Sequence, residues 1–238
     1  MIRPGVVAVI AASFLLGGCG TPRPEPLRQG HTEAFAATAL VRAVPEGGEP
    51  IQVSAHAWRG RDGTLKVLVT KAEVDVLVAH LDPGGRLRLW SPRQHEVSDT
   101  RLTDPSLPTL LARLPLLVSE LTEGPIPASA TVAADGTLRT TDGDLIVSVA
   151  GTADRPTTKT LTTADGEVLL TIAYGEPKPF DALVRPARWT ATTAGGEALV
   201  ILRRFDALGD VSPERLRWDA PADAASVPPA VLLDHLNR

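Results

Sequence analysis

Tight-turn dipeptides recur along the chain at short intervals, and this spacing constrains the fold more than any other feature of the sequence. Such pairs supply the positive φ angles that two-residue hairpins require: Asp62-Gly63, Gly84-Gly85, Asp135-Gly136, Asp142-Gly143, Asp165-Gly166 and Gly195-Gly196. Between them lie short runs in which apolar and polar side chains alternate, such as residues 65–70 and 86–90. Roughly ten short strands joined by tight turns predict one antiparallel sheet, arranged as a meander or a barrel.

One segment departs from this pattern and predicts a helix over residues 106–121. It places large apolar side chains at a spacing of three and four: Leu107, Leu110, Leu111, Leu114, Leu117, Val118 and Leu121. Gly124-Pro125 ends the segment, and Pro115 should kink the helix or divide it in two. Because so many leucines have to be buried, we expect this helix to cover the concave face of the sheet.

These patterns together predict a mainly β, α+β fold. We expect a meandering antiparallel sheet or a barrel, with the leucine-rich helix over the concave face of the sheet. Residues 223–238 contain Pro228-Pro229 followed by the apolar residues Val231, Leu232 and Leu233. This C-terminal part is expected to be either a tail or a short closing helix.

The first eighteen residues have the three parts of a secretory signal. Arg3 precedes an apolar run from Val6 to Leu16, which is shorter than the about 20 apolar residues of a membrane-spanning helix. Leu16, Gly17 and Gly18 then lead to Cys19, a sequence that resembles the bacterial lipobox. The resemblance implies that the Cys19 thiol receives a diacylglyceryl group and that residues 1–18 are removed. The alternative is an ordinary signal peptide followed by a chance cysteine.

Residues 19–32 are expected to tether the lipid to the folded domain. Pro22, Pro24 and Pro26 alternate with polar residues, which favours an extended chain without internal hydrogen bonds. The protein should therefore be exported and should contact a membrane through lipidated Cys19. Gly20, rather than aspartate, follows the cysteine; by resemblance to enteric sorting rules, this favours the periplasmic face of the outer membrane in a host with two membranes.

Composition and motifs exclude several classes of function. A net charge of −4 with mixed signs argues against nucleic-acid binding, which needs a basic face. The five histidines show no metal-ligand spacing, and the sequence contains none of the common nucleophile, phosphate-binding or dinucleotide-binding motifs. We therefore expect no catalytic residue, cofactor or metal site, and a monomer that is not an enzyme. With Cys19 lipidated, no disulfide can form.

Tryptophan is the most frequent type among the few aromatic residues, together with phenylalanine. Each of the four tryptophans falls in or at the end of a predicted strand: Trp58, Trp90, Trp189 and Trp218. They either pack in the core or at a barrel rim, or line an apolar ligand cavity. The candidate cavity combines two of them with the helix, as Leu107, Leu110, Leu111, Leu114, Leu117, Val118, Trp58 and Trp90.

The order of these elements resembles the LolA/LolB-like lipoprotein carrier superfamily over residues 33–222. Residues 74–78, the Gly84-Gly85 turn and residues 86–92 resemble a strand, turn and second strand ending in proline before the helix. Residues 174–189 and 217–221 are similar to the closing strands of that superfamily. The resemblance implies a half-open sheet whose concave side is plugged by helices and holds acyl chains of lipoproteins or other lipids.

Two hypotheses about function follow from this interpretation. The first is a non-enzymatic lipoprotein that binds an acyl chain or lipid between sheet and helix and takes part in lipoprotein or lipid transfer at the cell envelope. The second is a non-catalytic structural or interaction lipoprotein whose core is closed, with the helix simply part of that core.

Overall fold

The structure is a computed structural model that describes residues 32–45, 47–105, 107, 112, 114–152, 155–180 and 183–234. The predicted signal peptide, Leu16, Gly17, Gly18 and the lipid attachment site Cys19 lie outside the described residues. The predicted tether does so too, except for its last residue, Thr32. The lipobox and the anchor therefore stay predictions.

Most of the described chain is β-strand. The strands are β1 (Ala34–Pro45), β2 (Ile51–Arg59), β3 (Leu65–Lys71), β4 (Val74–Leu81), β5 (Arg86–Ser91), β6 (Glu96–Arg101), β7 (Thr131–Val132), β8 (Leu138–Asp142), β9 (Leu145–Gly151), β10 (Pro156–Thr163), β11 (Val168–Tyr174), β12 (Pro177–Phe180), β13 (Leu183–Pro186), β14 (Arg188–Thr193), β15 (Gly196–Leu208) and β16 (Ala225–Ser226). Three short helices accompany them in the described part of the chain: α3 (Leu114–Thr122), α4 (Pro213–Leu216) and α5 (Pro229–Asp234).

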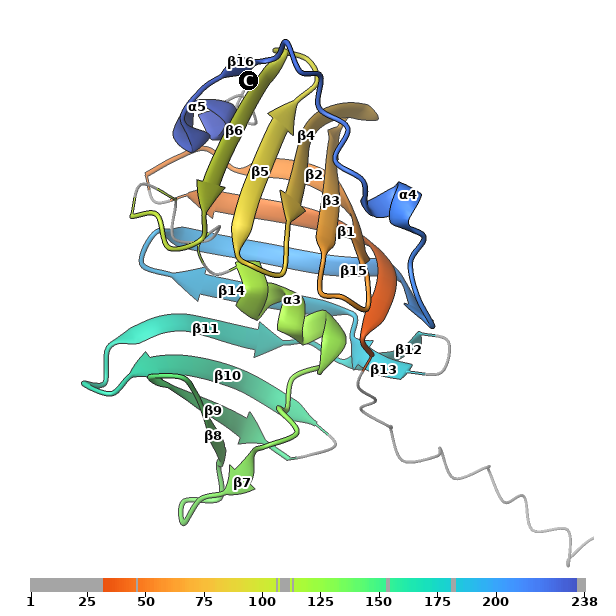
Figure 1. Ribbon diagram of the computed structural model, residues 1–238. Coiled ribbons are helices and arrows are strands. Elements are labelled where there is room, and N and C mark those ends of the chain that lie inside the picture. Colours follow the sequence, from red (N-terminus) through yellow and green to blue (C-terminus); the bar gives the residue numbers. More distant parts are fainter. Residues whose placement is uncertain are drawn as a thin grey trace, which may run out of the picture.

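Fourteen of these strands form one bent sheet in the order β16-β6-β5-β4-β3-β2-β1-β15-β14-β11-β10-β9-β8-β7, and β12 pairs with β13 (Figure 1). Neighbouring strands are antiparallel except β16, which runs parallel to β6. The two edge strands, β16 and β7, do not pair with each other, so the sheet is not closed. A mainly β, antiparallel and open architecture is thus confirmed.

The sheet has an inner face that holds the main core and an outer face that is mostly polar. Strand β5 illustrates the alternation, because Leu87 and Leu89 are fully buried on the inner face while Arg86 and Arg88 point outward. Inward residues of the other strands complete the core, among them Phe35, Leu65, Leu77, Leu161, Leu170, Ile172 and Phe205. Burial of this one continuous apolar face is the main force that holds the fourteen strands together.

The predicted helix over residues 106–121 is wrong in its extent. The described helix α3 begins at Leu114 and ends at Thr122, and the described part of the chain contains no long helix. Pro115 is the second residue of the described helix α3, and Ala112 before it is also helical. Residues 106, 108–111 and 113 lie outside the described residues.

The C-terminal segment belongs to the same folded unit as the sheet. Residues 225 and 226 form β16 along the edge of β6, where the Val227 N–H donates to the Val97 carbonyl at 2.8 Å. Helix α5 follows, and its Leu232 is fully buried in the core cluster. Of the two alternatives for this segment, the structure contains the short helix, beside β6 in Figure 1.

We expect the two turn glycines Gly143 and Gly151 to respond differently to alanine. A Cβ at Gly151 (φ +99°) would lie 2.5 Å from the backbone oxygen of Arg155, whereas one at Gly143 (φ +59°) meets nothing within 4 Å. Gly143→Ala should therefore lower the free energy of unfolding by only about 1–2 kcal/mol, which the left-handed backbone conformation costs a residue with a Cβ. Gly151→Ala should cost more, measured as the free energy of unfolding in urea. Equal losses would contradict this geometry.

Candidate functional site

Helix α3 lies across the ends of β3 to β5 and between them and β10 and β11 (Figure 1). Its apolar side chains pack against the inner core but stay only partly buried: Leu114, Leu117, Val118 and Leu121. A helix that belonged to a closed core would bury such a leucine row completely. Here the helix rests at the margin of the sheet, so that some apolar surface remains accessible beneath and beside it.

A cleft of about 390 Å³ opens between α3 and the turns that connect β2 to β3 and β4 to β5. Its apolar lining comes from both sides, as Leu65, Leu81, Leu102, Pro115 and Val118. Polar and charged groups also line it, as Arg59, Asp82, Ser119, Thr122 and Glu123. The cleft thus combines an apolar wall with groups able to contact a polar head.

The far side of α3 is fixed by a charged side chain that enters the core. Glu120 is 4% exposed, forms an ion pair with Lys159 of β10, and accepts a hydrogen bond of 2.6 Å from the Tyr174 hydroxyl of β11. Lys159, also 4% exposed, donates to the Gly124 carbonyl at 3.4 Å. Buried ions of this kind are tolerated only when partners satisfy them, and both members of this pair have such partners.

Burial governs the protonation of this group of residues. Burial raises the pKa of the Glu120 carboxyl, while Lys159 and the Tyr174 hydroxyl act in the opposite direction by stabilising the carboxylate. Burial, followed by the neighbouring Glu120, also raises the pKa of Tyr174 well above its ordinary value. Tyr174 therefore keeps its proton at physiological pH and remains a hydrogen-bond donor to Glu120.

The C-terminal end of α3 is held by further contacts at Thr122. The Thr122 carbonyl accepts a hydrogen bond of 3.2 Å from the Arg185 guanidinium of β13 and one of 2.9 Å from the Thr32 N–H. Arg185 is 1% exposed, and its guanidinium lies 5.8 Å from the centre of the Phe205 ring. Since Thr32 also precedes β1, the chain enters the domain directly beside the end of α3, and Arg59 of the cleft donates to the Glu33 carbonyl at 2.7 Å.

Four of the predicted cavity residues from the leucine-rich segment are described, and each contacts the inner core. Leu107 is 7% exposed in the core cluster, and Leu114, Leu117 and Val118 pack against that cluster from α3. Among these, Val118 also lines the cleft. Leu110 and Leu111 lie outside the described residues.

The two predicted cavity tryptophans, Trp58 and Trp90, do not lie with these leucines. Trp58 packs against Val211 and Leu216 on the outer face of the sheet. Trp90 alternates with Leu89 along β5 and so points to the same outer face as Arg88. The pleat of the strands therefore removes both tryptophans from the inner surface, whereas Trp189 lies in the inner core.

Sequence reasoning missed the buried polar residues Glu120, Lys159, Tyr174 and Arg185. Their positions along the chain gave a signal. Lys159 lies two residues before Leu161 on β10 and therefore points to the same inner face, and Glu120 lies one helical turn after Leu117. A charged residue on an apolar face needs a partner, which the sequence alone does not identify. Within the described residues, no group of three or more His, Cys, Asp and Glu side chains is placed to hold a metal ion.

None of the helices in the described part of the chain has the length and apolar character needed to cross a membrane. The sequence matches no protein-family model and no curated protein. Solved structures do resemble the fold. One is a LolA superfamily protein from Nitrosomonas europaea, with a TM-score of 0.53 and 13% identity, covering 78% of this chain and 90% of that one.

Two further solved structures have lower similarity scores. A DUF1329 family protein from Desulfovibrio piger has a TM-score of 0.50 and 9% identity, covering 80% of this chain and 92% of that one. A putative outer membrane lipoprotein-sorting protein domain from Vibrio parahaemolyticus has a TM-score of 0.49 and 13% identity, covering 86% and 92% of the two chains. At this level of identity, the similarity to the LolA superfamily protein establishes a shared fold.

Breaking the buried pair from one side should destabilise the protein strongly. Glu120→Ala leaves the Lys159 ammonium buried without its counter-ion, which typically costs about 3–5 kcal/mol. The double variant Glu120→Ala with Lys159→Met should recover part of this loss, because it removes the isolated charge. Urea denaturation measures both values. Arg61→Ala serves as the control, since Arg61 pairs with Glu33 on the surface, and it should leave stability unchanged; a double variant as unstable as Glu120→Ala would contradict this account.

Proposed function

We propose that the protein is a membrane-anchored lipoprotein that binds an acyl chain or lipid between α3 and the inner face of the sheet, and takes part in lipoprotein or lipid transfer at the cell envelope. The observation that carries the proposal is the cleft of about 390 Å³ beside a helix whose apolar side chains are only partly buried. Apolar clefts bind acyl chains through burial, without a requirement for many specific polar groups.

The composition of the cleft supports a ligand with an apolar chain and a polar end. Leu81, Leu102 and Val118 offer apolar surface, while Arg59 and Glu123 place charges of opposite sign on the same lining. A wholly apolar molecule would make no favourable contact with these charged groups. A lipid with a polar head, or the acylated terminus of a lipoprotein, matches both parts of the lining.

The attachment of α3 supports its role as a movable cover. Contacts from β10, β11 and β13 hold its C-terminal end, through Glu120 and Thr122. At the other end Pro115 is exposed and lines the cleft. A helix fixed at one end can tilt about that end and admit a chain beneath its first turn without breaking the buried ion pair.

Anchoring and location form part of the same proposal. Lipid on Cys19 would keep the domain at a membrane, and Gly20 favours the periplasmic face of the outer membrane in a host with two membranes. Thr32 lies beside the end of α3 through its bond to Thr122, and Arg59 of the cleft binds the Glu33 carbonyl. The cleft is therefore close to the point at which the tether joins the domain.

The proposal predicts that the protein co-purifies with lipid. The full chain carrying Cys19→Ala, which has no thiol for lipid attachment, should be purified without detergent and extracted with chloroform and methanol, and the extract analysed by mass spectrometry. We expect acyl lipid at about one molecule per chain. Val118→Gln, at the cleft, should lower this amount severalfold, whereas Val132→Gln on exposed β7 should not. Empty extracts from the parent would contradict lipid binding.

The alternative, a structural lipoprotein with a closed core, is distinguished by shortening Leu114. In a closed core the loss of a leucine side chain costs about 2–5 kcal/mol, as we expect for Leu170→Ala at the centre of the sheet. Leu114→Ala should cost less than that and should change the affinity for a fluorescent fatty acid. If Leu114→Ala destabilises the protein as much as Leu170→Ala and leaves fatty-acid binding unchanged, the closed core is the better interpretation.

A further inference from the structure

A segment of the C-terminal region, residues 210–219, crosses the outer face of the sheet and is called here the outer strap. It contains α4 and contributes Leu216, which packs against Trp58 of β2. A second cleft of about 650 Å³ lies between the outer strap and the β2–β3 turn. Its lining residues are Asp62, Thr64, His80, Asp210, Val211, Pro213, Glu214, Leu216, Arg217 and Trp218. This cleft is on the opposite side of the sheet from α3.

The outer strap rests on one transverse row of side chains. Cross-strand pairing places Trp58, Lys66, His80, Arg88 and Asp99 directly beside one another across β2 to β6. Such directly opposed residues have neighbouring side chains on the same face of the sheet. Any change of charge in the middle of this row therefore acts on its immediate neighbours and on the outer strap above them.

Three members of the row hold the outer strap. Lys66 donates to the Arg217 carbonyl at 2.7 Å and pairs with Asp219 at 2.9 Å. The Arg88 guanidinium lies 5.1 Å from the centre of the Trp218 ring, and the His80 ring meets that indole edge-on at 6.1 Å. The His80 ring also lies close to the Leu216 backbone of the outer strap.

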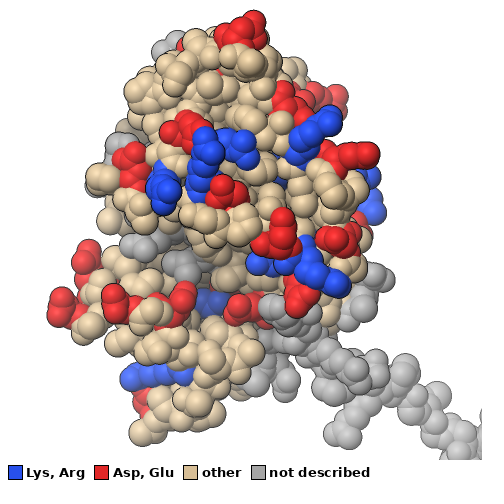
Figure 2. Space-filling model, viewed as in Figure 1, with Lys and Arg blue, Asp and Glu red and all other residues tan. Residues whose placement is uncertain are grey.

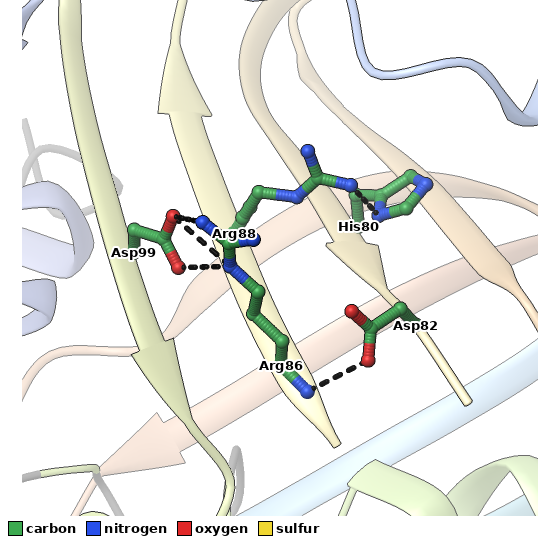
Figure 3. Close-up of polar contacts among 5 residues, drawn as sticks. All are labelled: His80, Asp82, Arg86, Arg88 and Asp99. Carbon is green, nitrogen blue, oxygen red and sulfur yellow. Dashed lines mark hydrogen bonds and ion pairs between the residues drawn. The ribbon is translucent and has the colours of Figure 1, made fainter. Parts of the chain in front are cut away.

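His80 is only 5% exposed, and its contact with Arg88 determines which ring nitrogen carries the proton. Its Nδ1 lies 3.0 Å from Nη2 of Arg88, the contact drawn in Figure 3. A guanidinium has only donors, so Nδ1 must accept and cannot carry a proton. The proton of the neutral ring is therefore on Nε2, for which the Leu216 backbone of the outer strap is the neighbouring acceptor. In this tautomer His80 links Arg88 to the outer strap.

We propose that His80 is a pH-sensitive latch: a proton on its Nδ1 removes the acceptor for Arg88, places a third cation between Lys66 and Arg88, and releases the outer strap from the sheet. The reaction involves one proton taken from solvent and no other reactant. Release of the strap uncovers Trp58 and Trp218, so the outer face would gain an exposed aromatic surface in acid. This inference does not depend on lipid binding at α3.

The charges around His80 favour its neutral form. The flanking cations are Lys66 on β3 and Arg88 on β5. The nearby opposing group is Asp82, directly after β4, which accepts a hydrogen bond from the Arg86 N–H (Figure 3). The other carboxylates beside it are already engaged, Asp99 by the Arg86 guanidinium and Asp219 by Lys66 and Arg217. The cleft in front of the ring adds Asp62, Asp210, Glu214 and Arg217. Figure 2 shows such acidic and basic side chains interspersed on this half of the molecule.

Burial, followed by Arg88, lowers the pKa of His80 below its ordinary value of 6.5, although the Leu216 carbonyl acts in the opposite direction. Because the folded state favours the neutral ring, the stabilisation from the latch is complete above about pH 6.5 and is lost as the pH falls through the lowered pKa. The described inner core contains no buried histidine, but Glu120 lies there and accepts a hydrogen bond from Tyr174, the cross-strand neighbour of Trp189. Trp189 therefore reports on changes in the inner core, independently of the latch.

The test uses the full chain with Cys19→Ala, labelled with 5-fluorotryptophan and followed by ¹⁹F NMR between pH 8 and pH 4 (about the range of a histidine titration). The Trp218 resonance is assigned with Trp218→Phe. We expect it to move to the position of a solvent-exposed indole in a one-proton transition that the Trp189 resonance does not share. A Trp218 resonance that changes only together with Trp189, on global unfolding, would overturn the proposal.

His80→Gln separates the latch from a general acid effect. The glutamine oxygen can accept from Arg88 and its amide can donate to the Leu216 carbonyl, but the side chain does not titrate. The strap should then stay closed throughout the range. His95→Gln is the control, since exposed His95 pairs with Asp223 at 3.3 Å away from the strap, and it should behave like the parent. An unchanged transition in His80→Gln would refute the latch.

A measurement on the unmodified His80 keeps the test valid if His80→Gln does not fold. A long-range ¹H–¹⁵N correlation spectrum of the imidazole at neutral pH distinguishes a protonated from an unprotonated ring nitrogen. We expect Nδ1 unprotonated and Nε2 protonated, with titration of Nδ1 at the same midpoint as the Trp218 transition. The opposite tautomer, or titration without movement of Trp218, would sink the proposal.

Discussion

The buried ion pair between Glu120 and Lys159 is the interaction on which the arrangement of helix and sheet depends. It joins α3 to β10, which lies far along the sheet from the β2–β3 and β4–β5 turns that α3 also contacts. Tyr174 and Arg185 add hydrogen bonds at the same end of α3. Apolar packing is not directional and would allow several positions for a short helix. Ions that need specific partners in the core select one position, and this position leaves a cleft.

The two faces of the sheet have different physical characters because of the pleat. Inward residues such as Leu87 and Leu89 make a continuous apolar surface, which α3 and α5 cover in part. Outward residues of the same strand carry charge, and there the outer strap is held by polar and aromatic contacts to Lys66, His80 and Arg88. The apolar inner face is suited to a lipid ligand, and the charged outer face is suited to a response to protons. The two proposed functions can therefore occupy opposite faces of one sheet.

Local signals in the sequence predicted the strands well and the helix poorly. Turn pairs such as Asp135-Gly136 and Asp165-Gly166 lie between consecutive strands, because a tight turn needs a backbone conformation that few residues adopt. Helical spacing alone extended the helix back to residue 106, although Pro115 marks the first turn of α3. The tryptophans show a similar limit, since strand propensity does not indicate which face of a strand is inside.

By itself, the sequence determined a mainly β, antiparallel chain with one leucine-rich helical segment, since alternation, turn residues and helical spacing act over a few neighbouring positions. Only the tertiary structure decided that the sheet stays open, that Trp58 lies on the outer face, and that Glu120 meets Lys159. It also decided that His80 lies between two cations. These contacts join residues far apart in the chain, and their energies depend on burial, which no local pattern specifies.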